Sequence, residues 1–225
     1  MPHREADTLT RSLLAAGAVG GFGFIIVWLV AGAIRPQYDP LYQPVSALSL
    51  GPGGWVQITN FIVTGILMVA FAIGSRRGLT PGRGATRGRI LIGAFGIGLI
   101  GAGVLVMDPS YGYPPGAPPG IPTTQSVRGQ LHDMASLVVF ACLSAAAFVF
   151  GRRFATQPGS RIWAAYSFLT ALLVAAFFIA AGAAWFGGGP GGLFQRVSIS
   201  AGWIWVGLLS IRMLRRPNSP RLDSR

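Results

Sequence analysis

Six long apolar stretches constrain the fold of this chain more than any other feature. A helix needs about 20 apolar residues to cross the hydrocarbon core of a bilayer. Stretches of suitable length lie at about residues 13–34, 57–74, 90–107, 131–150, 162–184 and 197–214. A backbone inside lipid must satisfy its own hydrogen bonds, so each stretch is expected to be helical. The sequence therefore predicts one all-α integral membrane domain over residues 1–225, a polytopic transmembrane helix bundle of six helices.

The composition agrees with a membrane protein and disagrees with a soluble one. Apolar residues make up 52% of the chain and charged residues 11%, whereas soluble domains carry about 25% charged residues. Small residues also recur at four-residue spacing, which lets helix backbones approach closely. This spacing is used more often within one chain than for a dimer, and it leaves the oligomeric state open. The residues are Gly17 and Gly21, then Ala94, Gly98 and Ala102, then Ala176, Ala180 and Ala184.

The first stretch has a second interpretation, a cleaved signal peptide. Residues Ala31, Gly32 and Ala33 resemble a cleavage site. The apolar stretch before them is longer than the roughly 7–15 residues usual in such peptides. We therefore expect a retained membrane span.

The arginines predict the orientation. The net charge of +12 comes from 18 arginines with no lysine. Their short clusters between apolar stretches favour anionic lipid headgroups over nucleic acid as a partner. If the spans alternate, all but three lie on one side, which predicts a multi-pass membrane protein with both termini in the cytoplasm. The three on the outer side are Arg35, Arg128 and Arg196; the others are Arg4, Arg11, Arg76, Arg77, Arg83, Arg87, Arg89, Arg152, Arg153, Arg161, Arg212, Arg215, Arg216, Arg221 and Arg225.

Two predicted outer segments, 35–56 and 108–130, are long and rich in Pro, Gly and Tyr. Repeated prolines favour a stiff, extended chain. Aromatic residues gather near this boundary, and we interpret them as an interfacial aromatic belt. They are Tyr38, Tyr42, Trp55, Tyr111, Tyr113 and Trp185.

Polar residues also gather at the predicted outer ends of the spans. Polar groups at membrane depth are costly, so each is a candidate site residue. The structural interpretation carries more weight: Asp133 would cap a helix start, Asp108-Pro109 would stop a helix, and Arg35 would reach the headgroups. A ligand or catalytic site is the alternative. The residues are Arg35, Gln57, Asn60, Asp108, His132, Asp133 and Arg196.

Counting ligands limits the chemistry. His132 is the only histidine in the predicted spans, and a zinc site requires about three His or carboxylate ligands. Cys142 is the only cysteine, so no intramolecular disulfide is possible. We predict neither a metal nor a cofactor.

Three segments, at 35–57, 108–116 and 129–133, carry a family resemblance. With them the chain resembles the membrane family known as domain of unknown function 998, over about residues 12–215. The resemblance implies about six helices, a plasma-membrane location and no established activity. Gln43 and Arg128 stand where relatives often have histidine, which lowers the expectation of a metal site. The polar positions carried over are Arg35, Asp39, Ser46, Asp108, His132 and Asp133.

Three functions follow, in order of preference. The first is binding of a lipid, a small amphiphile or a protein partner at the outer helix ends. The second is an enzyme acting on a lipid or isoprenoid at the outer leaflet, with Asp108 as acid or base and His132 as its partner. The third is a small-solute transporter, which the apolar span middles disfavour. The candidate binding residues are Arg35, Asp39, Ser46, Asn60, Asp133 and Arg196.

Overall fold

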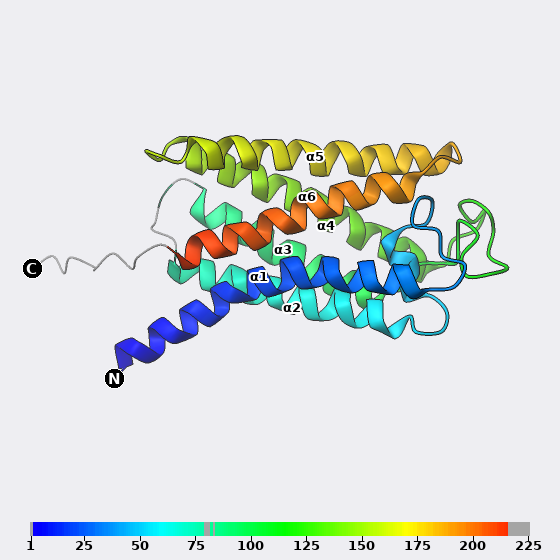
Figure 1. Ribbon diagram of the computed structural model, residues 1–225, viewed down its shortest axis with the longest axis horizontal. Coiled ribbons are helices and arrows are strands. Elements are labelled where there is room, and N and C mark those ends of the chain that lie inside the picture. Colours follow the sequence, from blue (N-terminus) through cyan, green and yellow to red (C-terminus); the bar gives the residue numbers. More distant parts are fainter. Residues whose placement is uncertain (1, 79–81, 83, 216–225) are drawn as a thin grey trace, which may run out of the picture.

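The computed structural model describes residues 2–78, 82 and 84–215, and shows six long helices (Figure 1). They are α1 (Pro2–Ile34), α2 (Trp55–Gly78), α3 (Ala85–Val104), α4 (Val127–Ala155), α5 (Arg161–Phe186) and α6 (Gly191–Leu214), with a short 3-10 helix, η1 (Val45–Ser49), between α1 and α2. No described residue belongs to a β-strand of a sheet, which confirms the all-α prediction. Of the arginines used for orientation, Arg83, Arg216, Arg221 and Arg225 lie outside the described residues.

All six helices are long and apolar enough to cross a membrane. The predicted stretches are therefore confirmed, with shifted boundaries. Helix α4 begins at Val127, before the predicted residue 131, because Ser126 caps its first turn. Helix α3 ends at Val104, before the predicted residue 107, so the interpretation of Asp108-Pro109 as its stop was wrong.

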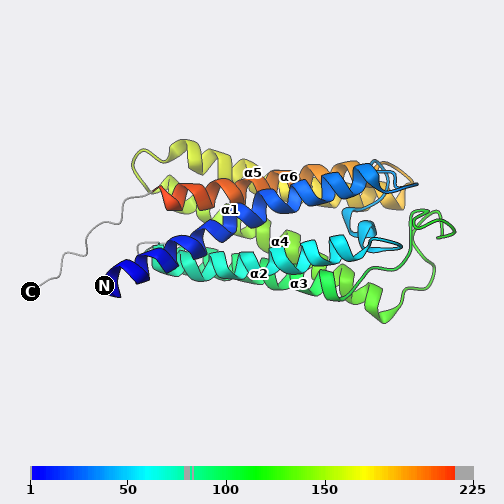
Figure 2. The ribbon, with the colours of Figure 1, turned by 60° about the horizontal axis from the view of Figure 1, so that its bottom comes forward.

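The helices form a closed ring. Each packs against its neighbours in sequence, and α1 packs against α6 to complete the circle (Figure 2). Close approach needs small residues: a Cβ on Gly21 of α1 would lie 2.7 Å from the Trp203 carbonyl oxygen of α6. Gly17 likewise faces Phe71 of α2. These two glycines of the predicted small-residue pattern serve packing within the chain.

Aromatic side chains fill the middle of the ring. Trp203 is 1% exposed, stacks on Phe24 with ring centroids 5.0 Å apart, and meets Phe95 edge-on at 4.9 Å. Phe71 and Phe150, in the C-terminal parts of α2 and α4, are also fully buried. The spans therefore converge on a dense apolar core.

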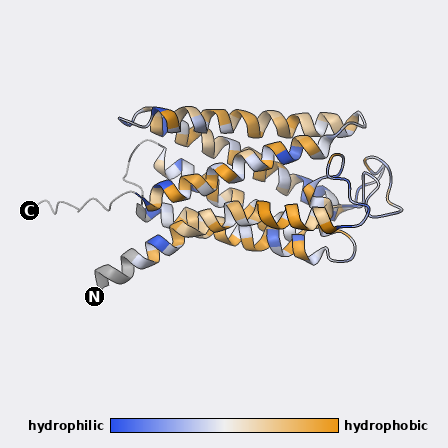
Figure 3. Ribbon diagram, in the orientation of Figure 1, coloured by the Kyte–Doolittle hydropathy of each residue, from blue (hydrophilic) through white to orange (hydrophobic). Residues whose placement is uncertain are grey.

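The two ends of the bundle differ. The long-loop end carries segments 35–54, 105–126 and 187–190, while α1 begins and α6 ends at the opposite, arginine-rich end (Figure 1). Apolar residues dominate the helices, and polar residues gather toward the loops and helix ends (Figure 3). The polar residues singled out from the sequence belong to the long-loop end.

Candidate functional site

A buried segment closes the long-loop end. Residues 43–49, here called the plug, are all buried, and they include η1. The Ser49 hydroxyl donates to the Ser46 carbonyl at 2.6 Å and tightens this turn. The Val45 amide donates to Oε1 of Gln195 on α6 at 2.9 Å, so its N–H stays satisfied away from water. A loop segment thus enters the bundle while this backbone N–H keeps a hydrogen-bond partner.

Arg196 clamps the plug from α6. Its Nη1 donates to the carbonyl oxygens of Gln43 and Gly192, each at 2.9 Å, and of Pro40 at 2.5 Å. Its Nη2 donates to the Tyr38 hydroxyl. The guanidinium carbon lies 5.5 Å from the centre of the Tyr38 ring, within cation–π range. The planar fork of arginine suits such convergent acceptors.

Gly192 makes this clamp possible. A Cβ there would lie 2.8 Å from the Pro40 carbonyl oxygen and even closer to that of Gln43. Glycine therefore lets the loop lie directly on the first turn of α6. The Leu193 amide completes the contact by donating to the Leu41 carbonyl at 2.9 Å.

Arg35 clamps the plug from the end of α1. It donates to the carbonyl oxygens of Leu48 and Leu50, each at 3.2 Å, and to that of Pro52. Asp39 is exposed and accepts from the Leu41 amide at 2.9 Å, which closes a local turn. Three of the predicted binding residues, Arg35, Asp39 and Arg196, therefore hold the loop around the plug.

The tyrosines of the long-loop end form part of this structure. The Tyr38 hydroxyl donates to the Pro44 carbonyl at 2.9 Å, and burial raises the pKa of Tyr38 to about 12 despite the nearby Arg196. Tyr38 and Tyr113 are buried and meet edge-on at 5.4 Å, so the aromatic-belt interpretation was wrong for them. Trp55, at 69% exposed, keeps an exposed position that fits a belt.

The second long loop docks on the first. Tyr111 stacks on Trp185 with centroids 5.3 Å apart, and the Trp185 indole donates to the Tyr42 carbonyl at 2.7 Å. Burial raises the pKa of Tyr111 to about 12, and the charge of Asp133 adds to this. Gln43 donates to the Tyr111 carbonyl at 3.2 Å. Gln43 thus joins the loops.

Asp108 organises the start of α4. Its Oδ2 accepts from the Ser126 amide at 2.7 Å, and its Oδ1 accepts from the Ser126 hydroxyl at 2.6 Å. That hydroxyl also accepts from the Gly129 amide at 3.0 Å, an N-cap bond. The carboxylate lies where a Gly129 Cβ would stand. The cap is therefore Ser126, and the prediction that Asp133 caps this helix was wrong.

His132 joins α4 to the end of α3. It is 2% exposed, and its Nδ1 lies 2.6 Å from the Leu105 carbonyl and 3.1 Å from that of Ala102. Carbonyls only accept, so these contacts assign a proton to Nδ1. Asp133 is exposed on α4 and accepts from Gln125 at 3.0 Å.

Arg128 and Asn60 each donate to a backbone carbonyl of a neighbouring helix. Arg128 donates to the Val104 carbonyl at 3.2 Å, again at the α3–α4 junction. Asn60 is buried on α2 and donates to the Phe24 carbonyl of α1 at 3.2 Å and to Gln57 at 3.3 Å. The predicted residues do not converge on one point: they surround the plug, the α3–α4 junction and the α1–α2 contact.

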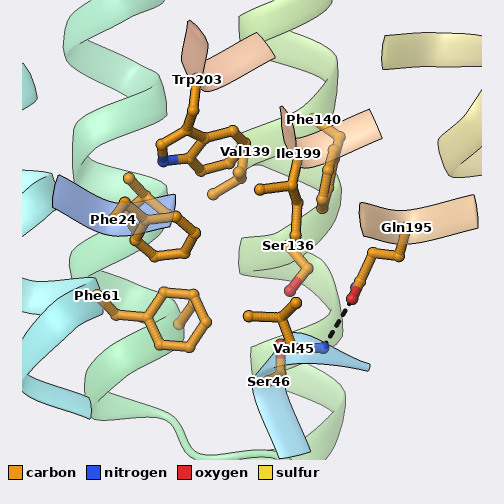
Figure 4. Close-up of a pocket in the computed structure, with 12 residues that line it drawn as sticks. Phe24, Val45, Ser46, Phe61, Ser136, Val139, Phe140, Gln195, Ile199 and Trp203 are labelled. Atoms are coloured by element: carbon orange, nitrogen blue, oxygen red, sulfur yellow. Dashed lines mark hydrogen bonds between the residues drawn. The ribbon is translucent and has the colours of Figure 1, made fainter. Parts of the chain in front are cut away.

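A small chamber lies beneath the plug. Its volume is about 20 Å³, room for about one water molecule. Figure 4 shows the Ser136 hydroxyl pointing toward Val45 and Ser46, with Gln195 beside them. Phe24, Phe61, Phe140 and Trp203 contribute aromatic walls. In the described part of the chain, the buried Trp203 indole N–H has no hydrogen-bond partner.

The sequence indicated only part of this chamber. Ser46 was predicted as a binding residue, and His132 lies one turn from Ser136 on α4. Gln195 and Ser136 were not selected as site residues. Ser136 has apolar neighbours in the sequence and Gln195 adjoins the selected Arg196, but only the packing of α4, α6 and the plug brings the two side chains together. Among the described residues, no three His, Cys, Asp or Glu side chains are grouped to hold a metal ion.

Six apolar spans define a multi-pass α-helical membrane protein, and a buried loop closes a small chamber at one end of it. Residues 18–212 match the family model described as "Protein of unknown function (DUF998)", and the chain belongs to this family. The resemblance seen in the sequence is thereby confirmed. Searches of curated proteins and of solved structures found no match.

Proposed function

We propose that this protein binds an amphiphilic molecule of the bilayer at its long-loop end, with a polar group the size of a hydroxyl in the chamber beneath the plug. The observation that carries the proposal is the chamber. Polar side chains are costly inside a membrane bundle and mark functional sites. Ser46, Ser136 and Gln195 border this chamber.

The acid–base alternative has less support. Both carboxylate oxygens of Asp108 accept hydrogen bonds from Ser126, so the proposed acid or base is engaged in capping α4. A transporter also has less support, because Phe95, Trp203 and Phe71 fill the ring. Protein binding remains an outcome of the experiment below.

The proposed orientation places the long-loop end outside the cell. The opposite end carries exposed arginines, which fit the cytoplasmic leaflet. Examples are Arg11 on α1, Arg152 on α4 and Arg215 directly after α6. The plasma membrane is the proposed location. Reporter fusions at the C-terminus and within segment 105–126 test this, and a cytoplasmic signal from the loop fusion contradicts it.

Native mass spectrometry with lipid analysis tests the binding. The protein is extracted with its own lipids, and wild type is compared with Ser136→Leu, which fills the chamber. Ser12→Leu is the matched control, because Ser12 is exposed on α1 at the arginine-rich end. We expect a defined molecule on wild type and Ser12→Leu and its loss from Ser136→Leu. Equal, nonspecific lipid profiles in all three, or a bound protein in place of a lipid, contradict the proposal.

A further inference from the structure

A groove between α4 and α5 opens toward the surrounding bilayer. Its volume is about 730 Å³, within the usual range of ligand pockets, about 300–1,000 Å³. Small side chains, Ala141 and Ala145 on α4 and Ala175 on α5, leave the space. Helix α5 is the least buried of the six spans. The groove therefore lies where lipid chains reach it.

Two aromatic pairs bracket the groove. Phe140 stacks on Phe178 with centroids 4.2 Å apart, and Phe148 meets Phe168 edge-on at 5.5 Å. The two α4 phenylalanines are eight residues apart, which corresponds to about 12 Å along a helix. A helix from another chain is about 10–12 Å wide, so it would have no room to spare between the two aromatic pairs. A hydrocarbon chain is slim enough to lie between them.

The groove also has an almost entirely apolar lining. Its lining is apolar except for Ser144, whose hydroxyl donates to the Ala171 carbonyl at 2.8 Å. The one polar side chain of the lining therefore already has a hydrogen-bond partner and does not need water or a headgroup. Apolar cavities of this kind hold apolar ligands. The occupant that fits this surface is the hydrocarbon part of a lipid.

Phe140 connects the groove to the chamber. It is 5% exposed and lines both cavities, with Phe178 on the groove side and Trp203 on the chamber side. Ser136, one turn away on α4, borders the chamber. One aromatic ring thus lies between the chamber, which has three polar side chains in its lining, and the groove.

We propose that the hydrocarbon chain of the bound amphiphile lies in the α4–α5 groove and that the molecule reaches the chamber from the side, past Phe140. This inference rests on the proposed function, because it assigns the two parts of one ligand to two adjoining cavities. Rotation of the Phe140 side chain joins the cavities without displacing the plug or its arginine clamps.

Photo-crosslinking tests the position of the chain. The probe is a phospholipid with a photoreactive group midway along one acyl chain, reconstituted with the full-length protein. We expect labelled peptides from α4 and α5 and at least a several-fold loss of labelling in Ala175→Phe. Ala176→Phe is the matched control, because Ala176 is exposed on the same helix but does not line the groove. Equal loss in both variants, or labelling centred on the exposed face of α1, overturns the inference.

A second pair of variants tests Phe140. Phe140→Ala is expected to release the bound molecule several-fold faster in native mass spectrometry, whereas Phe148→Ala, which lines only the groove, leaves the rate unchanged. Equal rates in the two variants overturn the role of Phe140. If wild type retains a defined molecule while Ala175→Phe retains it equally, the groove inference fails and the proposed function stands. If wild type retains none, the proposed function itself fails.

Discussion

The two ends of the bundle use arginine differently. At the long-loop end, Arg35, Arg128 and Arg196 donate to backbone carbonyl oxygens. At the other end, Arg76, Arg152 and other arginines are exposed. Arg153 and Arg212 are exceptions there: Arg153 is buried, and Arg212 donates to Ser160 and lies against two aromatic rings. The same residue type thus builds a fixed structure at one end through its donor geometry and contributes charge at the other.

Replacing Arg196 should have the largest effect on stability. Arg196→Gln removes donors from three carbonyl oxygens and from Tyr38, and we expect a loss of about 3 kcal/mol in the free energy of unfolding. Arg196→Lys should recover little, because an ammonium lacks the planar fork. The measurement is denaturant unfolding in detergent micelles. The control is Arg215→Gln at the exposed end of α6, and equal losses in the two variants would break the comparison.

The Asp108–Gly129 contact should have the next largest effect. Asp108→Ala removes the bonds to Ser126, at a cost of about 1–2 kcal/mol. Gly129→Ala should cost a similar amount, because its Cβ collides with the carboxylate. In the double variant the collision disappears, so the two losses should not add. Gly23→Ala is the control, since its added Cβ would meet no atom within 4 Å apart from its chain neighbours and the backbone of its own helix. Strict additivity in the cycle would contradict the assignment.

Alkaline pH should loosen the long-loop end. The pKa of Tyr38 is raised from 10.0 to about 12. A raised pKa favours the protonated form in the folded protein, so this contribution is complete below pH 10 and is lost as the pH rises toward 12. We expect a decline of about 2 kcal/mol or less over that interval. Unfolding of wild type and Tyr38→Phe is compared at each pH, and an equally steep decline in the variant would refute this role of Tyr38.

Neutralising exposed arginines should have the smallest effect on stability. Arg87→Gln and Arg152→Gln remove exposed charges, so we expect changes within about 0.5 kcal/mol. Their effect should appear in lipid preference, at about 1 kcal/mol per arginine for anionic surfaces. Partitioning between anionic and neutral lipid vesicles measures it. A stability loss as large as that of Arg196→Gln would show that this end is also built by specific contacts.

The sequence predicted the spans because hydropathy is a local signal that repeats over some 20 residues. It did not predict the plug, because its burial depends on Gln195, 150 positions from Val45 along the chain. Nor did it predict that Asp108 supports Ser126 as the cap of α4, since the two residues are 18 positions apart along the chain. Local composition identified the polar residues of the long-loop end; their partners came only from packing.

Hydrogen–deuterium exchange tests the central claim, that the long-loop end is a ligand site and the other end is not. Exchange is compared between protein in nanodiscs of its own lipids and protein stripped of lipid. Because a ligand stabilises the structure that binds it, the account predicts that amides of residues 43–49 and 127–133 lose protection on delipidation. Residues 152–161, at the arginine-rich end, should change little. Unchanged protection of the plug, or equal loss at both ends, would contradict the account.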